Sequence, residues 1–178
     1  TDPRLLGAPE LLRQCLGALA GDPVADTAEF RGTLLAHPGN PRDVYEGVAA
    51  ALATLRDAGA ALGVVTNKPQ RLATALIEDV ALAPFFGAVV GGDAADRPKP
   101  AADPILLAMA LLAANPARTL FVGDSSIDAV AARAAAMPFL LFSAGYGAEE
   151  VTSEMSAARF GRFDELPTLL TGALGKRA

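Results

Sequence analysis

The stretch LFVGDSSIDAVAARAA, residues 120–135, runs from an apolar segment through a short turn into an alanine-rich segment. The apolar segment predicts a buried strand, and the alanine-rich segment predicts a helix. Asp124 stands at the end of the strand and Asp128 in the first turn of the helix. Capping by the serines between them and the helix dipole explain Asp128. They explain Asp124 poorly, because a carboxylate that ends an apolar strand is an odd choice unless it binds something.

Strand-to-helix steps recur on both sides of this stretch. Their alternation predicts an α/β fold, with a parallel sheet, right-handed crossovers and helices on both faces. Ligands bind such sheets beyond the carboxyl ends of the strands, so a site is expected in the loops that follow them. Strands are predicted at 61–66, 87–93, 119–124 and 138–143, and helices at 43–55, 68–82, 103–115, 126–137 and 164–174.

The first part of the chain has a different pattern. Residues 8–21 and 26–37 each have the pattern of an amphipathic helix, and no predicted strand separates them. The turn-rich sequence HPGNP then leads into the α/β part. We therefore predict a helical subdomain or partial cap over residues 1–41 and an α/β core over residues 42–178. Cys15 lies among leucines, and we expect its thiol to be buried.

Composition excludes several classes of function. The 178 residues carry a net charge of -5, which favours neither a nucleic acid nor an anionic membrane as partner. No apolar run of about 18 residues occurs, so no membrane span is expected. Cys15 and His37 are the only cysteine and the only histidine, which excludes a zinc site built from several such ligands. A metal must then be bound by oxygen atoms, as Mg²⁺ is, and a reducing compartment such as the cytoplasm is expected.

Two further loops carry residues that suit a phosphate group. Thr66 and Asn67 lie between a predicted strand and a predicted helix, where a hydroxyl and backbone N–H groups favour an anion. The alternative is that Thr66 only caps the helix. Lys99 stands between two prolines that stiffen its backbone, the alternative being a solvated surface lysine. Because Thr66, Lys99 and Asp124 follow three strands of one parallel sheet, we expect them to converge on one crevice.

In this order, the motifs resemble those of the haloacid dehalogenase superfamily, most closely its phosphoglycolate phosphatase-like branch. The resemblance implies a Rossmann-type parallel sheet and, over residues 8–41, the distal part of a helical cap. It covers about residues 42–170 and rests on GVVTNKP (63–69), RPKPAADP (97–104), TLFVGDSSID (119–128) and SAGYG (143–147).

The resemblance also implies roles for individual residues. Thr66 and Asn67 match the phosphate-binding second motif, and Lys99 matches the lysine of the third motif. Asp124 matches a Mg²⁺ ligand of the fourth motif, and Asp128 matches the acidic residue that supports it at the metal. On this basis Thr66, Lys99 and Asp124 are the predicted catalytic residues, and Asp124 and Asp128 are the predicted metal site.

One motif of the superfamily does not occur. Members begin with an apolar strand that ends in DxDGT, whose first aspartate is the nucleophile and whose second is the general acid/base, and the 178 residues contain no DxDGT. The resemblance places that strand in the centre of the sheet, between the predicted strands at 62–66 and 119–123. We therefore expect the first strand to be missing, the sequence to be an incomplete copy of a family member, and the chain as given to be inactive.

The functional prediction is a Mg²⁺-dependent phosphohydrolase of a small phosphorylated metabolite, phosphoglycolate by resemblance, acting through an aspartyl-phosphate. The alternative is a non-catalytic domain of the same fold with a binding or assembly role. A dehalogenase is disfavoured, because such family members need no Mg²⁺ and the phosphate- and metal-binding set would be unexplained. Exposed sheet edges would also allow oligomers to form.

Overall fold

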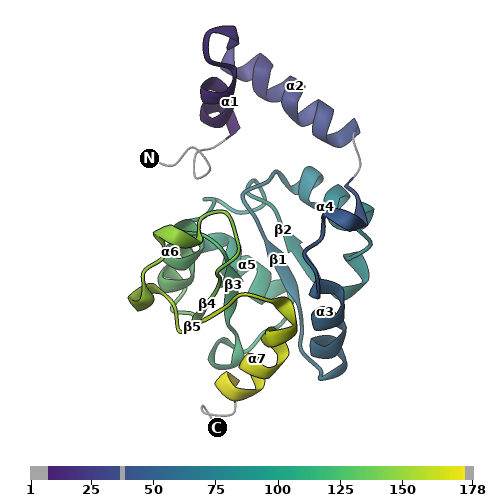
Figure 1. Ribbon diagram of the computed structural model, residues 1–178, viewed down its shortest axis with the longest axis vertical. Coiled ribbons are helices and arrows are strands. Elements are labelled where there is room, and N and C mark those ends of the chain that lie inside the picture. Colours follow the sequence, from purple (N-terminus) through teal and green to yellow (C-terminus); the bar gives the residue numbers. More distant parts are fainter. Residues whose placement is uncertain (1–7, 37–38, 175–178) are drawn as a thin grey trace. The chain divides into compact units, whose positions relative to one another are not determined.

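The computed structural model describes residues 8–36 and 39–174 and contains two compact units, Thr1–Pro38 and Gly39–Ala178 (Figure 1). In the first unit, α1 (Ala8–Leu16) packs against α2 (Pro23–Ala36). Cys15 in α1 is exposed, so the prediction of a buried thiol is wrong. Within the predicted 1–41 segment, residues 1–7 and 37–38, including His37, lie outside the described residues.

Strands and helices alternate in the second unit, which confirms the predicted α/β fold with parallel strands and flanking helices. None of the described helices is long and apolar enough to cross a membrane. In chain order the helices and strands are α3 (Val48–Asp57), β1 (Gly63–Val65), α4 (Gln70–Asp79), β2 (Ala88–Val90), α5 (Asp103–Leu111), β3 (Phe121–Gly123), α6 (Ser126–Ala134), β4 (Phe139–Phe142), β5 (Ala158–Phe160) and α7 (Leu166–Leu174).

The strands form two separate groups. In one group β1 pairs with β2, with Val64 opposite Val89. In the other group β4 lies between β3 and β5, with Val122 opposite Leu140. Within the described residues, β1 and β3 therefore each have one edge without a strand partner. These are the two strands between which the family resemblance places an absent strand; that a further strand belongs there stays a prediction.

Two hydrophobic clusters hold the two groups of strands together. In the first, Leu55 of α3 and Leu166 of α7 are buried, and Val122 of β3 and Leu62, just before β1, pack against them. The second cluster contains Ile105 of α5 and Ala131 of α6 together with Met137, and both Val65 of β1 and Phe121 of β3 pack against it. Each cluster thus contacts both groups of strands, so burial of apolar side chains joins them in place of backbone pairing.

Two features of the second unit differ from the prediction. The helix predicted from residue 43 begins at Val48, because Pro41–Asp43 forms a 3-10 turn and Gly47 has a left-handed φ of +84°. The strand β5 is absent from the prediction, because its three residues include an arginine and form no apolar run. Its pairing with β4 through the backbone gives it its strand conformation.

Candidate active site

The structure brings the predicted residues to one end of the strands. Thr66 directly follows β1, Asp124 directly follows β3, and Lys99 lies in the loop between β2 and α5. The Nζ atom of Lys99 donates a hydrogen bond to the backbone oxygen of Val65, at 2.9 Å. The same atom lies 2.7 Å from Oδ1 of Asp128. Lys99 therefore links the end of β1 to the first turn of α6, across the junction of the two groups of strands.

The ion pair of Lys99 and Asp128 is buried. The lysine side chain is 10% exposed and the aspartate side chain 8% exposed. The Nζ atom of Lys99 also lies 5.5 Å from the centroid of the Phe121 ring, within the range of a cation–π contact. Neither charge can lose its partner without leaving an uncompensated buried charge. The alternative in which Lys99 is a solvated surface residue is therefore wrong.

Asn67 holds the main chain of Lys99 from both sides. Its Oδ1 atom accepts a hydrogen bond from the Lys99 backbone N–H at 3.0 Å, and its Nδ2 atom donates to the Lys99 backbone oxygen at 2.9 Å. Both ends of the Asn67 amide thus serve to position the lysine. That Asn67 also contacts a phosphate stays a prediction.

Asp128 has partners on both carboxylate oxygens. Besides the ion pair on Oδ1, its Oδ2 atom accepts a hydrogen bond from the Ser125 hydroxyl at 2.7 Å and from the Asp124 backbone N–H at 3.3 Å. Ser125 is also the N-cap of α6. These contacts make Asp128 the residue that connects the lysine, the helix start and the loop carrying Asp124.

Asp124 is half-buried, and Gly145 approaches its side chain closely. Its Oδ2 atom accepts a hydrogen bond from the Tyr146 backbone N–H at 3.1 Å. A Cβ atom on Gly145 would lie 2.1 Å from the Asp124 Cβ, and one on Gly123 would lie 2.6 Å from the Asp128 Cβ. Only glycine fits at these contacts. The other oxygen of Asp124, Oδ1, accepts no hydrogen bond from a described residue.

Thr66 does not cap the helix that follows it, which overturns that alternative. Its Oγ1 atom accepts a hydrogen bond from the Lys68 backbone N–H at 3.2 Å, whereas α4 begins later, at Gln70. The Gln70 backbone N–H donates to Oδ1 of Asp93 at 2.6 Å, so a carboxylate that the sequence reasoning missed occupies the start of α4. The signal was present, since Asp93 follows the GG pair at the end of the β2 segment. A phosphate at this loop would therefore depend on the Thr66 hydroxyl rather than on the start of α4.

Comparison with known proteins agrees with this arrangement. The model for haloacid dehalogenase-like hydrolases matches residues 35–142, which is more than half of the chain. The chain belongs to this hydrolase family. The phosphoglycolate phosphatase of Cereibacter sphaeroides (strain ATCC 17029) is 37% identical to it, over 92% of this chain and 77% of that protein. The phosphoglycolate phosphatase of Caulobacter vibrioides is also 37% identical, over 96% of this chain and 77% of its own length.

Solved structures share the fold of this hydrolase. CbbY from Rhodobacter sphaeroides, in a complex with phosphate, superposes with a TM-score of 0.71 at 23% identity, over 92% of this chain and 76% of CbbY. At that identity the likeness concerns the fold alone. The more similar relatives support the assignment of the chain as a phosphatase of the haloacid dehalogenase-like family.

The donor atoms at Asp124 fit the Mg²⁺ ion that the family implies. Within residues 8–36 and 39–174, no group of three or more His, Cys, Asp or Glu side chains is placed to hold a metal. Oδ1 of Asp124 accepts no hydrogen bond from the described residues, whereas both oxygens of Asp128 are engaged. Mg²⁺ commonly takes one or two carboxylates and completes its shell with water and phosphate oxygens. This set therefore suits a Mg²⁺ ion bound by Asp124 and supported indirectly by Asp128.

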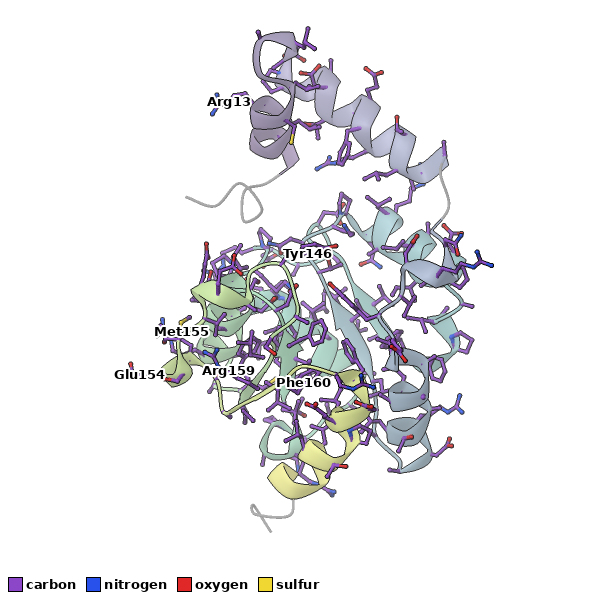
Figure 2. The ribbon with its side chains drawn as sticks, viewed as in Figure 1. Arg13, Tyr146, Glu154, Met155, Arg159 and Phe160 are labelled. Atoms are coloured by element: carbon purple, nitrogen blue, oxygen red, sulfur yellow. The ribbon has the colours of Figure 1, made fainter. Side chains whose placement is uncertain are left out.

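Two tyrosines also lie at this end of the strands, and sequence reasoning did not assign them to the site. Figure 2 shows Tyr146 on the loop after β4, apart from Glu154 and Met155 at the side of the core. Burial raises the pKa of the Tyr45 phenol, and its charge interactions with Tyr146 and Asp124 raise it further. The Tyr45 ring packs against Phe142, the last residue of β4, although no short motif connects the two in sequence.

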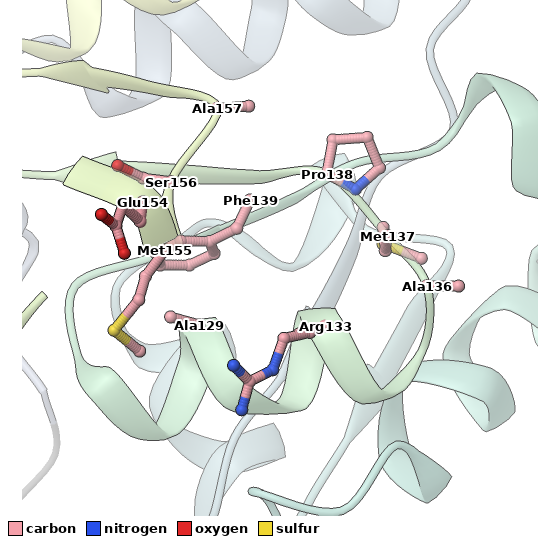
Figure 3. A pocket seen from close by; sticks show the side chains of 10 residues that line it. All are labelled: Ala129, Arg133, Ala136, Met137, Pro138, Phe139, Glu154, Met155, Ser156 and Ala157. Carbon is pink, nitrogen blue, oxygen red and sulfur yellow. The ribbon is translucent and has the colours of Figure 1, made fainter. Parts of the chain in front are cut away.

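A hollow of about 650 Å³ lies on another side of the core (Figure 3). Arg133 of α6 and Met155 are among its lining residues, with Phe139 of β4 at its base. None of the predicted site residues lines this hollow. The candidate site is thus defined by converging side chains at the strand ends and not by this cavity.

Proposed function

We propose that the chain provides the phosphate- and metal-binding part of a Mg²⁺-dependent phosphohydrolase that acts on a small phosphorylated metabolite. The observation that carries the proposal is the buried Lys99, held by Asp128, Val65 and Asn67 beside the loop of Asp124. A fixed cation suits a phosphoryl group, and a neighbouring carboxylate with an oxygen that no described residue binds suits its metal. The names of the relatives favour phosphoglycolate as the substrate.

Each residue of the chain has a part in this proposal. The Lys99 ammonium stabilises the charge on the phosphoryl oxygens, and the Thr66 hydroxyl donates to one of them. Asp124 binds Mg²⁺, which when present supplies further positive charge to the phosphoryl group. Asp128 and Asn67 keep the lysine in place. The Tyr146 backbone N–H orients the Asp124 carboxylate through its hydrogen bond to Oδ2.

The proposed reaction proceeds through an aspartyl-phosphate, and the nucleophilic aspartate is not one of the 178 residues, since these contain no DxDGT. We infer that it belongs to a strand that pairs with the unpartnered edges of β1 and β3. Paired in parallel with both strands, it would end at the same level as Thr66 and Asp124, because the described strands are parallel within each group. The single cysteine of the sequence, which allows no disulfide within it, favours the cytoplasm as the location.

The experiment is strand complementation. A synthetic peptide with an apolar strand of about six residues followed by DxDGT is added to the chain, and phosphate release from 2-phosphoglycolate and a panel of phosphorylated metabolites is measured with Mg²⁺. We expect release with the peptide, none with its NxDGT counterpart, and none from the chain alone. Turnover by the chain alone would contradict the inference about the nucleophile. Binding of the peptide without turnover on any substrate would contradict the phosphohydrolase.

A second candidate function is a non-catalytic domain that binds a phosphorylated ligand. The absence of DxDGT from the sequence favours it. In that case the chain binds inorganic phosphate, the Lys99→Met variant does not, and no DxDGT peptide produces turnover. The complementation experiment therefore separates the two functions.

A further inference from the structure

The loop that follows β4 is anchored on α6 by apolar packing. Its residues Ala148 and Val151 are buried in a hydrophobic cluster. The same cluster contains Ala129 and Ala132, which both belong to α6. Burial of these side chains fixes the far end of the loop against the helix, and the contacts of its near end decide how it meets Asp124.

The near end of the loop contacts the segment where β3 leads into α6. The Tyr146 backbone N–H donates a hydrogen bond to Oδ2 of Asp124 at 3.1 Å. A Cβ atom on Gly147 would lie 3.1 Å from the Ser125 Cβ, so the loop and this segment pass close together. A displacement of the loop would therefore also move the N–H group that binds the Asp124 carboxylate.

One hydrogen bond between side chains also ties the loop to α6. The hydroxyl of Ser126, the first residue of α6, donates to Oε2 of Glu150 at 2.9 Å, in a partly buried position. Ser125 already caps α6, so capping does not account for the Ser126 hydroxyl. The helix dipole favours a carboxylate at this end of α6 but does not require its hydrogen bond to Ser126. The bond therefore has a separate role, which is to fix the loop on the helix.

We propose that Ser126 and Glu150 are positioning residues for Mg²⁺ binding, which act on the Asp124 carboxylate through the loop and its Tyr146 backbone N–H. This inference rests on the proposed function, because it takes Asp124 as the residue that binds the metal. The loop holds the carboxylate at Oδ2, which leaves Oδ1, the oxygen that accepts no hydrogen bond from a described residue, in a fixed direction for the ion. Neither Ser126 nor Glu150 touches the metal itself.

The test is a titration of the chain with Mg²⁺, followed by nuclear magnetic resonance. We expect Ser126→Ala and Glu150→Ala each to weaken Mg²⁺ binding about threefold to tenfold, the equivalent of one hydrogen bond. Glu150→Gln keeps an oxygen that accepts from the Ser126 hydroxyl, so its Mg²⁺ affinity should stay close to that of the unsubstituted chain. A loss in Glu150→Gln as large as in Glu150→Ala would make the charge of Glu150 the cause and overturn the inference.

Glu154→Ala is the matched control. It removes the same charge from the next turn of the chain, where Glu154 lines the hollow at the side of the core (Figure 3). Its Mg²⁺ affinity should not change. A loss in Glu154→Ala equal to that in Glu150→Ala would attribute the effect to net charge and likewise overturn the inference.

The metal-free chain separates this inference from the proposed function, because its Tyr146 amide signal reports the hydrogen bond to Asp124 without any ion. We expect Ser126→Ala and Glu150→Ala to shift that signal and Glu150→Gln to leave it in place. These shifts, in a chain that binds no Mg²⁺, would contradict the proposed function and keep the positioning of Asp124. Mg²⁺ binding that neither Ser126→Ala nor Glu150→Ala weakens would overturn the inference alone.

Discussion

Replacing Lys99 by methionine removes the ammonium and keeps an unbranched side chain of similar length. Asp128, whose side chain is only 8% exposed, then lacks the cation that otherwise lies 2.7 Å from its Oδ1 atom. The backbone oxygen of Val65 also loses a hydrogen-bond donor. Removal of one partner of a buried ion pair costs about 3–5 kcal/mol. Because Asp128 keeps its hydrogen bonds from Ser125 and from the Asp124 backbone, we expect a loss of about 3 kcal/mol, at the lower end of that range.

The assay is urea unfolding followed by circular dichroism, with thermal unfolding as a second measure. A loss of about 3 kcal/mol corresponds to a fall of about 6–12 °C in Tm for a unit of this size. The double variant Lys99→Met with Asp128→Asn removes the uncompensated buried charge of Asp128, so it should recover most of the lost stability. Arg97→Met is the matched control from the same loop: its ion pair with Asp103 lies at the surface, the arginine side chain being 74% exposed, and Tm should not change.

Three results would contradict this reasoning. If the free energy of unfolding of Lys99→Met lies within about 1 kcal/mol of that of the unsubstituted chain, the ion pair contributes no more than a solvent-exposed pair does. A double variant no more stable than Lys99→Met would mean that the uncompensated charge of Asp128 is not the cause of the lost stability. A fall in Tm for Arg97→Met as well would attribute the effect to the loop as a whole.

Two further predictions concern Asp124 and its neighbours. Gly145→Ala places a methyl group 2.1 Å from the Asp124 Cβ, so we expect it to lower the free energy of unfolding in urea by about 1–3 kcal/mol. Gly161→Ala is the control, because its added Cβ makes only an ordinary contact at 3.6 Å and should not destabilise the chain. Equal stability of the two variants would contradict the close approach of Gly145 to Asp124. Because the pKa of Tyr45 is raised in the folded chain, the unfolded chain loses its phenolic proton first, and stability should fall as pH rises above about 10. Urea midpoints at about pH 9 and about pH 11, compared with those of Tyr45→Phe, measure this, and a Tyr45 pKa at or below its ordinary value would refute it.

The elements that sequence reasoning predicts correctly are those decided by local patterns. The strand-to-helix step at 120–135 is an example, because an apolar run, a serine cap and an alanine-rich helix lie side by side in the chain. The same holds for the position of Thr66, Lys99 and Asp124 at strand ends, since parallel strands place their carboxyl ends at one edge. The family follows from the order of these motifs.

What the sequence does not predict depends on contacts between distant residues. The Asn67 amide binds the main chain of Lys99, and its sequence context gives no sign of that partner. The Tyr45 ring packs against the Phe142 and Phe163 rings, which lie about a hundred residues further along the chain. β5 likewise lacks an apolar run, and its pairing with β4 decides its conformation.

The unpaired edges of β1 and β3 have a consequence for measurements on this protein. Within the described residues neither edge has a strand partner, and the backbone groups that side chains leave open there can pair with a strand of suitable length, including one from another copy of the chain. A strand that binds the folded form and not the unfolded form raises the free energy of unfolding with its concentration. The melting temperature is then a property of the solution as well as of the chain, and values measured at different protein concentrations should not be compared directly.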